Sequence, residues 1–233
     1  MTLQLAITTM EKASTPMSST TLVPSALSEE TVTDSETEEF LPYATDRHLS
    51  SELSIPMAIH QILNSQLRVL LAGFNSFDPE SHRDLCRALK DNTTLLELRI
   101  RDAQLNDTFC NIITELQKHP KLQILAITHS RGLEPPIMEA LAELLTHNAT
   151  LTELDLEANE ISDIKPLAEA LKRPKGSLRK LNLRSNQLQQ KDGQALLNAL
   201  RVNETLQRCS VVGNAISIKT IQRIRGYCSG NQP

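Results

Sequence analysis

Residues 151–161 read LTELDLEANEI and residues 178–188 read LRKLNLRSNQL, two copies of one apolar pattern, L-x-x-L-x-L-x-x-N-x-L. Further copies of this pattern, some of them looser, begin at Leu67, Leu95, Leu122 and Leu206. The starting positions are therefore separated by 28, 27, 29, 27 and 28 residues. A period this regular and of this length indicates stacked structural repeats, so it decides the fold.

Each repeat combines two rhythms. Its first seven residues alternate apolar and variable side chains, as in Leu154-Asp155-Leu156, which predicts a half-buried strand. Upstream of the strands, apolar residues recur at spacings of three and four, as at Leu167, Ala168 and Leu171, which predicts one helix face. Strands that recur after a helical crossover pair in parallel, and helices are wider than the spacing between strands. We therefore expect an α/β solenoid (a horseshoe) with a parallel β-sheet on its concave face and α-helices on its convex face.

This strand–helix unit of 27–29 residues resembles the ribonuclease-inhibitor-like class of leucine-rich repeats, and the resemblance covers residues 67–227. The class also occurs in Ran GTPase-activating protein, in nucleotide-binding innate immune receptors and in tropomodulin. The resemblance implies a recognition scaffold in which an asparagine side chain bonds to the turn backbone between adjacent units. That asparagine maps to Asn75, Asn159, Asn186 and Asn214, whereas Ala103 and Ser130 take its place in the second and third units.

Two further sequence features bear on the turns. Pro135 and Pro136 are expected to displace the start of the third helix and to make residues 128–137 irregular, because proline disfavours helix interiors. Four Asn-x-Ser/Thr sequons occur in the same chain. Since no secretion signal is apparent, we expect them to act in turns: Asn92, Asn106, Asn148 and Asn203.

Composition divides the chain into three parts. Residues 1–50 hold eight acidic, two basic and seventeen Ser/Thr residues with few large apolar side chains, which predicts a disordered, acidic, Ser/Thr-rich tail over residues 1–55. Residues 56–227 are expected to form the leucine-rich-repeat domain of about six repeats. Residues 228–233 are expected to form a short C-terminal tail.

Charge and hydropathy exclude several classes of partner. Residues 51–233 carry 22 basic and 20 acidic residues, and the whole chain has only six aromatic residues, so nucleic-acid binding is not expected. No apolar run approaches the length of a membrane span. The first residues lack a secretory pattern, and the four cysteines are not paired at motif spacing, so we expect a monomer in the cytoplasm.

No arrangement typical of catalysis is present in the sequence. There is no phosphate-binding glycine loop, no His/Cys cluster at metal-ligand spacing and no nucleophile elbow. Three carboxylates along one strand do not supply a matched acid and base. We therefore expect a protein that is not an enzyme and that has no catalytic residues, no cofactor and no metal site.

The candidate binding site consists of the side chains that point to the concave face between the core leucines. The polar members of this set are Glu97, Arg99, Arg101, Glu153, Asp155, Glu157, Lys180, Asn182, Arg184 and Arg208. One interpretation is that Glu153 pairs with Lys180, and Glu157 with Arg184, as a solvated surface. The other is that the stripes give electrostatic specificity for a protein ligand. The two interpretations are compatible in the absence of a partner.

The predicted function is a non-enzymatic protein–protein interaction module that binds a protein partner through the concave face of the solenoid. The family resemblance keeps a second class open, a regulator of a GTPase or of actin filament ends. A third alternative is a bacterial effector that is delivered into host cells and acts in the host cytosol, because a Ser/Thr-rich leader ahead of a recognition domain would suit that role.

Overall fold

The computed structural model describes residues 68–73, 79–173 and 176–231, which all belong to one compact unit. Six strands form its sheet: β1 (Val69–Gly73), β2 (Glu97–Arg101), β3 (Ile124–Thr128), β4 (Glu153–Asp155), β5 (Lys180–Asn182) and β6 (Arg208–Ser210). Six helices alternate with them: α2 (Pro79–Asp91), α3 (Phe109–Gln117), α4 (Pro135–His147), α5 (Lys165–Leu171), α6 (Gln190–Leu200) and α7 (Ile218–Gly230). The tail predicted over residues 1–55 lies outside the described residues.

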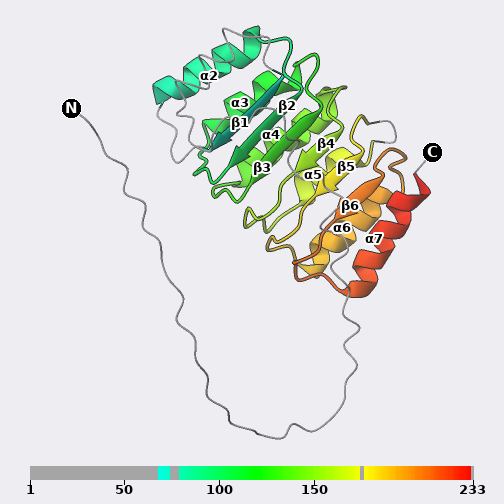
Figure 1. Cartoon of the computed structure of the whole chain (residues 1–233). Helices are drawn as coiled ribbons and strands as arrows, with labels where there is room; N and C mark the ends of the chain where they lie inside the picture. Colours follow the sequence, from blue (N-terminus) through cyan, green and yellow to red (C-terminus); the bar gives the residue numbers. More distant parts are fainter. Residues whose placement is uncertain (1–67, 74–78, 174–175, 232–233) are drawn as a thin grey trace, which may run out of the picture. The chain divides into compact units, whose positions relative to one another are not determined.

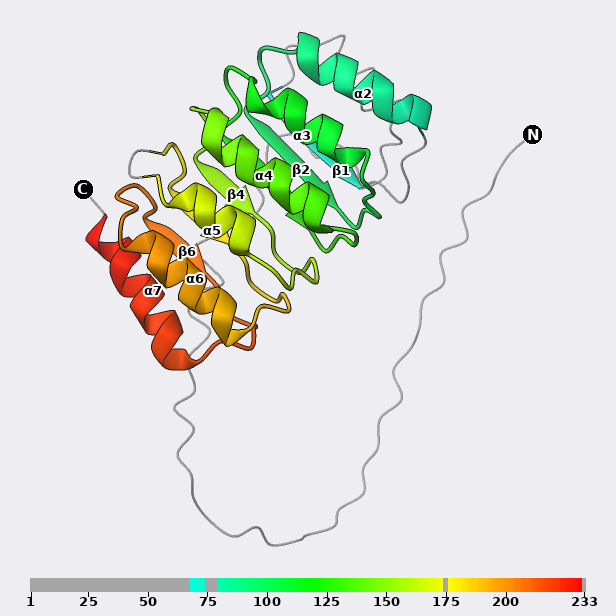
Figure 2. The ribbon, with the colours of Figure 1, turned by 180° about the vertical axis from the view of Figure 1, so that it is seen from behind.

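All neighbouring strands are parallel and follow the chain order from β1 to β6. The helices lie side by side on one face of the sheet, as Figures 1 and 2 show from opposite sides. The predicted solenoid is therefore confirmed. We call the face of the sheet that points away from the helices the concave face.

The strand register aligns the middle core residue of each repeat in one row. Leu98, Leu125, Leu154, Leu181 and Cys209 are partners on successive strands, and all five are buried. Because side chains alternate along a strand, this row fixes the intervening residues on the concave face. Cys209 thus serves as a small core hydrophobe in the last strand of this row.

The same turn recurs after each of the described strands β2 to β6. Its eighth repeat residue has a positive φ in five successive units: Asp102, His129, Ala158, Ser185 and Gly213. The left-handed backbone at these positions is thus part of the repeat. The third and fourth units each contain one further left-handed residue, Gly132 and Glu160. At Gly132 φ is +87° and a Cβ atom would lie 2.3 Å from the carbonyl oxygen of Leu105.

The prolines of the third unit do not displace its helix, which corrects the sequence-based expectation. Helix α4 begins at Pro135, 13 residues after Leu122, and α5 begins at Lys165, 14 residues after Leu151. Prolines at the first two helical positions are tolerated because the first N–H groups of a helix have no intrahelical acceptor.

The asparagine ladder forms where the family resemblance places it within the described residues. Asn159, Asn186 and Asn214 each donate a side-chain N–H to a carbonyl of the preceding unit, those of Ile127, Leu156 and Leu183 respectively. Ser130 substitutes in part, because its hydroxyl accepts the backbone N–H of Ala103 at 3.1 Å. Asn75 lies outside the described residues.

A second row of polar side chains closes the turns between helices and strands. The Oδ1 atoms of Asn92, Asn148 and Asn203 each accept the N–H of the third following residue at 2.7–2.8 Å. These three asparagines are buried, which confirms their predicted role in turns. His119 takes the equivalent position in its unit, and its Nδ1 accepts the N–H of Leu122 at 3.1 Å.

The final helix is longer than expected. Helix α7 continues to Gly230, and Cys228 within it is only 2% exposed. The repeat domain therefore extends past the predicted boundary at residue 227, because Cys228 completes the core of the last unit. Ile218, the first residue of this helix, is 51% exposed.

Candidate functional site

Strands β2 to β6 bring the predicted polar residues onto the concave face. Glu97, Ile124, Glu153, Lys180 and Arg208 are partners in one row across the sheet. The next row towards the strand ends contains Arg99, Ala126, Asp155, Asn182 and Ser210. Neutral side chains of β3 therefore separate the charges of β2 from those of β4 in both rows.

Opposite charges meet between β4 and β5, as the sequence predicts. Lys180 Nζ lies 3.2 Å from Glu153 Oε2, and Arg184 Nε lies 4.0 Å from Glu157 Oε1. Glu157 also accepts a hydrogen bond of 3.0 Å from the side-chain amide of Asn182. Both expected pairs are confirmed. Lys180 holds Glu153, and the hydrogen bond from Asn182 holds Glu157 in place on the face.

The charges of β2 are paired locally. Arg99 Nε donates to the Glu97 carboxylate two residues before it, and both side chains are largely buried. Arg101 Nε lies 3.3 Å from Asp102 Oδ2, with the Arg101 side chain half exposed. The accessible positive charge on this side of the face therefore belongs to Arg101.

Asp155 is the unusual ionisable group of the face. It is only 8% exposed, and its Oδ1 accepts the backbone N–H of Glu157 at 3.0 Å. Burial raises the pKa of Asp155 to about 6; the charges of Glu157 and Glu153 act in the same direction, while the Glu157 N–H and Arg99 oppose the shift. Asp155 is thus a carboxyl group that titrates near neutral pH.

The expected site residues differ in accessibility. Asn182 has no exposed surface, so it contacts no partner in this conformation and instead supports Glu157. Glu153 is 6% exposed and is held by Lys180. Arg101 is exposed, and Arg99, Glu157, Lys180, Arg184 and Arg208 are half-buried.

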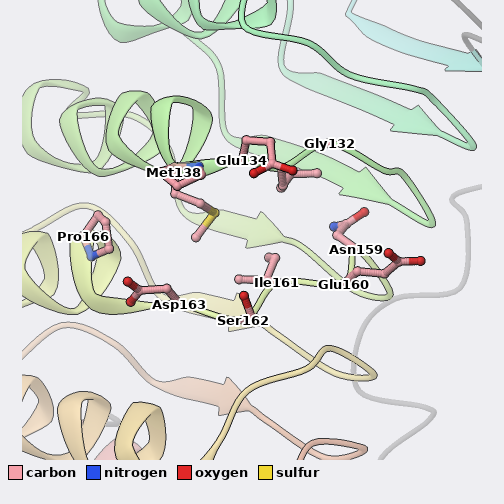
Figure 3. A pocket seen from close by; sticks show the side chains of 11 residues that line it. Gly132, Glu134, Met138, Asn159, Glu160, Ile161, Ser162, Asp163 and Pro166 are labelled. Carbon is pink, nitrogen blue, oxygen red and sulfur yellow. The ribbon is translucent and has the colours of Figure 1, made fainter.

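The structure also shows a pocket that sequence analysis missed. It has a volume of about 160 Å³ and lies between the loop that precedes α4 and the loop that precedes α5. Figure 3 shows Met138, Ile161 and Pro166 in it together with the carboxylates of Glu134, Glu160 and Asp163. The sequence shows a glycine at position 132, and in the structure this residue has a positive φ in the loop that lines the pocket.

No group of three or more His, Cys, Asp or Glu residues that could hold a metal ion occurs in residues 68–73, 79–173 and 176–231. Among the same residues, no helix is long and apolar enough to cross a membrane.

A family model described as "Leucine Rich repeat" matches residues 147–164 and 177–197, which contain strands β4 and β5. The chain therefore contains leucine-rich repeats. This chain resembles ribonuclease inhibitor from Sus scrofa, with 28% identity over 147 residues that cover 62% of the chain and 32% of the relative. It is also 32% identical to human NACHT, LRR and PYD domains-containing protein 14 over 44% of the chain and 10% of that protein.

A comparison of structures finds the tropomodulin C-terminal domain of Caenorhabditis elegans, with a TM-score of 0.46 and 13% identity over 77% of this chain and 93% of that one. The chain spans about a third or less of the length of the curated relatives described above.

Proposed function

We propose that this leucine-rich-repeat protein is a non-enzymatic module that binds a protein partner through the concave face of β2 to β6. The observation that carries the proposal is the pairing of opposite charges on adjacent strands, Glu153 with Lys180 and Glu157 with Arg184. The similarity to ribonuclease inhibitor supports a binding role, since that relative is named for inhibiting an enzyme.

Fixed charges on a rigid sheet suit the recognition of another protein. Side chains that are already held by their neighbours lose little conformational entropy when a partner arrives. Alternating positive and negative positions favour a partner with the complementary pattern and penalise one with like charges opposite. Such a surface needs no cofactor, no metal ion and no second copy of the chain.

Exchanging the members of one ion pair tests the proposal. The double variant Glu157→Arg/Arg184→Glu keeps one positive and one negative side chain at the junction of β4 and β5 but reverses the pattern that a partner meets. Partners captured by the full-length chain from extracts of cells that express it would be identified, purified and titrated against both proteins. We expect at least about ten-fold weaker binding to the exchanged variant.

A matched control exists on the opposite side of the molecule. Lys172 Nζ lies 2.7 Å from Glu169 Oε1 on helix α5, and both side chains are about half exposed. The exchange Glu169→Lys/Lys172→Glu changes the same number of charges on the helical face and is expected to leave affinity unchanged. Equal binding by the concave-face variant, or loss of binding only in the α5 variant, would contradict the proposal, provided that both variants melt cooperatively.

A further inference from the structure

The pocket between the third and fourth units combines an apolar interior with an acidic edge. Met138 and Ile161 are each only 3% exposed, and Pro135 and Pro166 contribute further apolar surface. At about 160 Å³ the pocket is smaller than the roughly 300–1,000 Å³ typical of small-molecule sites. Its size therefore suits one long side chain better than a complete small molecule.

Three carboxylates stand around this interior (Figure 3), and all three belong to exposed residues: Glu134, Glu160 and Asp163. Glu134 and Asp163 form no ion pair with any residue that the structure describes in residues 68–73, 79–173 and 176–231. Asp163 uses Oδ1 to accept the backbone N–H of Lys165 at 2.8 Å, so its second oxygen can accept a donor from outside.

Arg131, a cation of the chain near this pocket, holds the Glu160 carboxylate weakly. Arg131 Nε lies 3.8 Å from Glu160 Oε1, and the two side chains are 82% and 61% exposed. Exposed pairs at such distances contribute little free energy. A cation from a partner could therefore approach Glu160 without breaking a strong contact.

An anion is a poor ligand for the same pocket. The N-terminus of α4 opens onto it, but Pro135 and Pro136 occupy the first two helical positions and carry no N–H. Two of the usual backbone donors for an anion at a helix start are thus missing, and the next two N–H groups, of Ile137 and Met138, donate to the carbonyl of Glu134. Both the carboxylates around the pocket and the prolines at the helix start therefore favour a cation over an anion.

We propose that this pocket binds a lysine or arginine side chain of a protein partner. The alkyl stem would lie against Met138, Ile161 and Pro166, and the cationic head would meet Glu134, Asp163 and Glu160. Long basic side chains bury their stems on apolar surface while their charges remain with polar partners. The chain's own first fifty residues are disfavoured as occupant because they carry eight acidic and only two basic residues.

Binding of single amino-acid analogues to the full-length chain tests the pocket independently of the concave face. The ¹⁵N-labelled protein would be titrated with N-acetyl-arginine amide, N-acetyl-lysine amide and the neutral isostere N-acetyl-citrulline amide. We expect saturable shifts of the backbone amide signals of Gly132 and Ser162 with the two cations, with affinity on the order of millimolar. The citrulline compound is expected to leave these signals in place.

Variants with matched charge changes complete the test. Glu134→Gln/Asp163→Asn removes two carboxylates from the pocket, whereas Glu139→Gln/Glu143→Gln removes two that lie elsewhere on α4 and do not line it. We expect at least about three-fold weaker binding of both cations in the first variant and unchanged binding in the second. Their dispersed amide spectra would show that both remain folded.

Three outcomes would overturn the proposal: equal shifts with citrulline, equal affinity in the pocket variant, or no saturable response to either cation. Shifts of the pocket signals with protein concentration alone would assign the pocket to a second copy of the chain instead. None of these outcomes bears on the concave face, because Glu157 and Arg184 are unchanged in every protein used.

Discussion

The backbone N–H of Asn159 donates to the side-chain oxygen of Asn186, 27 residues later, at 3.0 Å. The same Oδ1 accepts the N–H of Ile161 at 3.0 Å, while Nδ2 donates to the carbonyl of Leu156 at 2.9 Å. Asn186 is only 8% exposed. One buried amide therefore satisfies three backbone groups of the preceding unit and joins the two repeats.

Replacing Asn186 by alanine is expected to destabilise the solenoid by about 2–5 kcal/mol, because buried backbone groups left without a partner each cost about 1–3 kcal/mol. Urea unfolding followed by circular dichroism measures this change. Asn198→Ala is the control, since Asn198 is exposed and its amide bonds only to Gln194 among the described residues. Similar free energies of unfolding for the two variants would show that the ladder does not hold the repeats together.

Asp155 makes the stability of the folded protein depend on pH. The folded-state pKa of Asp155 is raised to about 6, chiefly by burial, whereas an unfolded aspartate has a pKa of 3.8. The folded state therefore binds the proton more tightly, so this group stabilises the fold below pH 3.8 and loses that contribution as pH rises through 6.

Asp155→Asn is consequently expected to stabilise the protein at pH 7.5, by roughly 1–3 kcal/mol, with the gain fading towards pH 4. The amide oxygen can still accept the Glu157 N–H, so the turn is retained. Free energies of unfolding of both proteins across this pH range give the comparison. A constant difference at all pH values would mean that titration of Asp155 is not the cause.

His119 introduces the opposite pH dependence. Burial lowers the pKa of His119, an effect that the backbone of Asn92 only partly offsets. Its Nδ1 accepts the N–H of Leu122, so protonation would remove the acceptor and bury a charge. Because the unfolded chain then binds the proton more readily, stability is present above pH 6.5 and is lost as pH falls below that value.

His119→Asn introduces at this turn the asparagine that other units have. In the next unit, Asn148 accepts the N–H of Leu151 in the same way as His119 accepts that of Leu122. The parent protein is expected to lose stability between pH 7.5 and pH 5, and the variant is expected to lose up to about 2 kcal/mol less over the same range. At pH 7.5 the two proteins are expected to have similar free energies of unfolding. Thermal or urea unfolding at the two pH values measures it. His82 and Asp155 are present in both proteins, so their contributions cancel, and an unchanged pH profile would exclude His119 as the source.

The sequence alone predicted the features that follow from periodicity. A regular repeat places Leu154 beside Leu181 and Glu153 beside Lys180, and both pairs are partners between β4 and β5 in the structure. The sequence could not predict that Asn182 is fully buried, because that depends on how neighbouring side chains cover it.

The acidic pocket was missed for a related reason. Gly132 and Glu160 both have positive φ in adjacent loops, and the space between two loops follows from backbone geometry that no apolar pattern encodes.

Two glycines in adjacent helices have opposite expected responses to alanine. A Cβ atom at Gly193 in α6 would lie 2.9 Å from Ile216 Cγ2 and 3.0 Å from Thr220 Cγ2, so α7 and the segment before it pack too closely to admit a methyl group. At Gly226 in α7, no atom apart from the neighbouring backbone of the helix itself lies within 4 Å of the same position. Alanine favours a helix over glycine by up to about 1 kcal/mol at either site.

Gly193→Ala is therefore expected to destabilise the protein by about 1–3 kcal/mol despite its higher helix propensity, because overpacking outweighs the propensity gain. Gly226→Ala is expected to stabilise it by about 0.5–1 kcal/mol, since no packing cost opposes the same gain. Urea unfolding of the two variants and the parent protein shows whether each substitution lowers or raises the free energy of unfolding. If Gly193→Ala were as stabilising as Gly226→Ala, α6 and α7 would not be in the close contact that completes the last repeat.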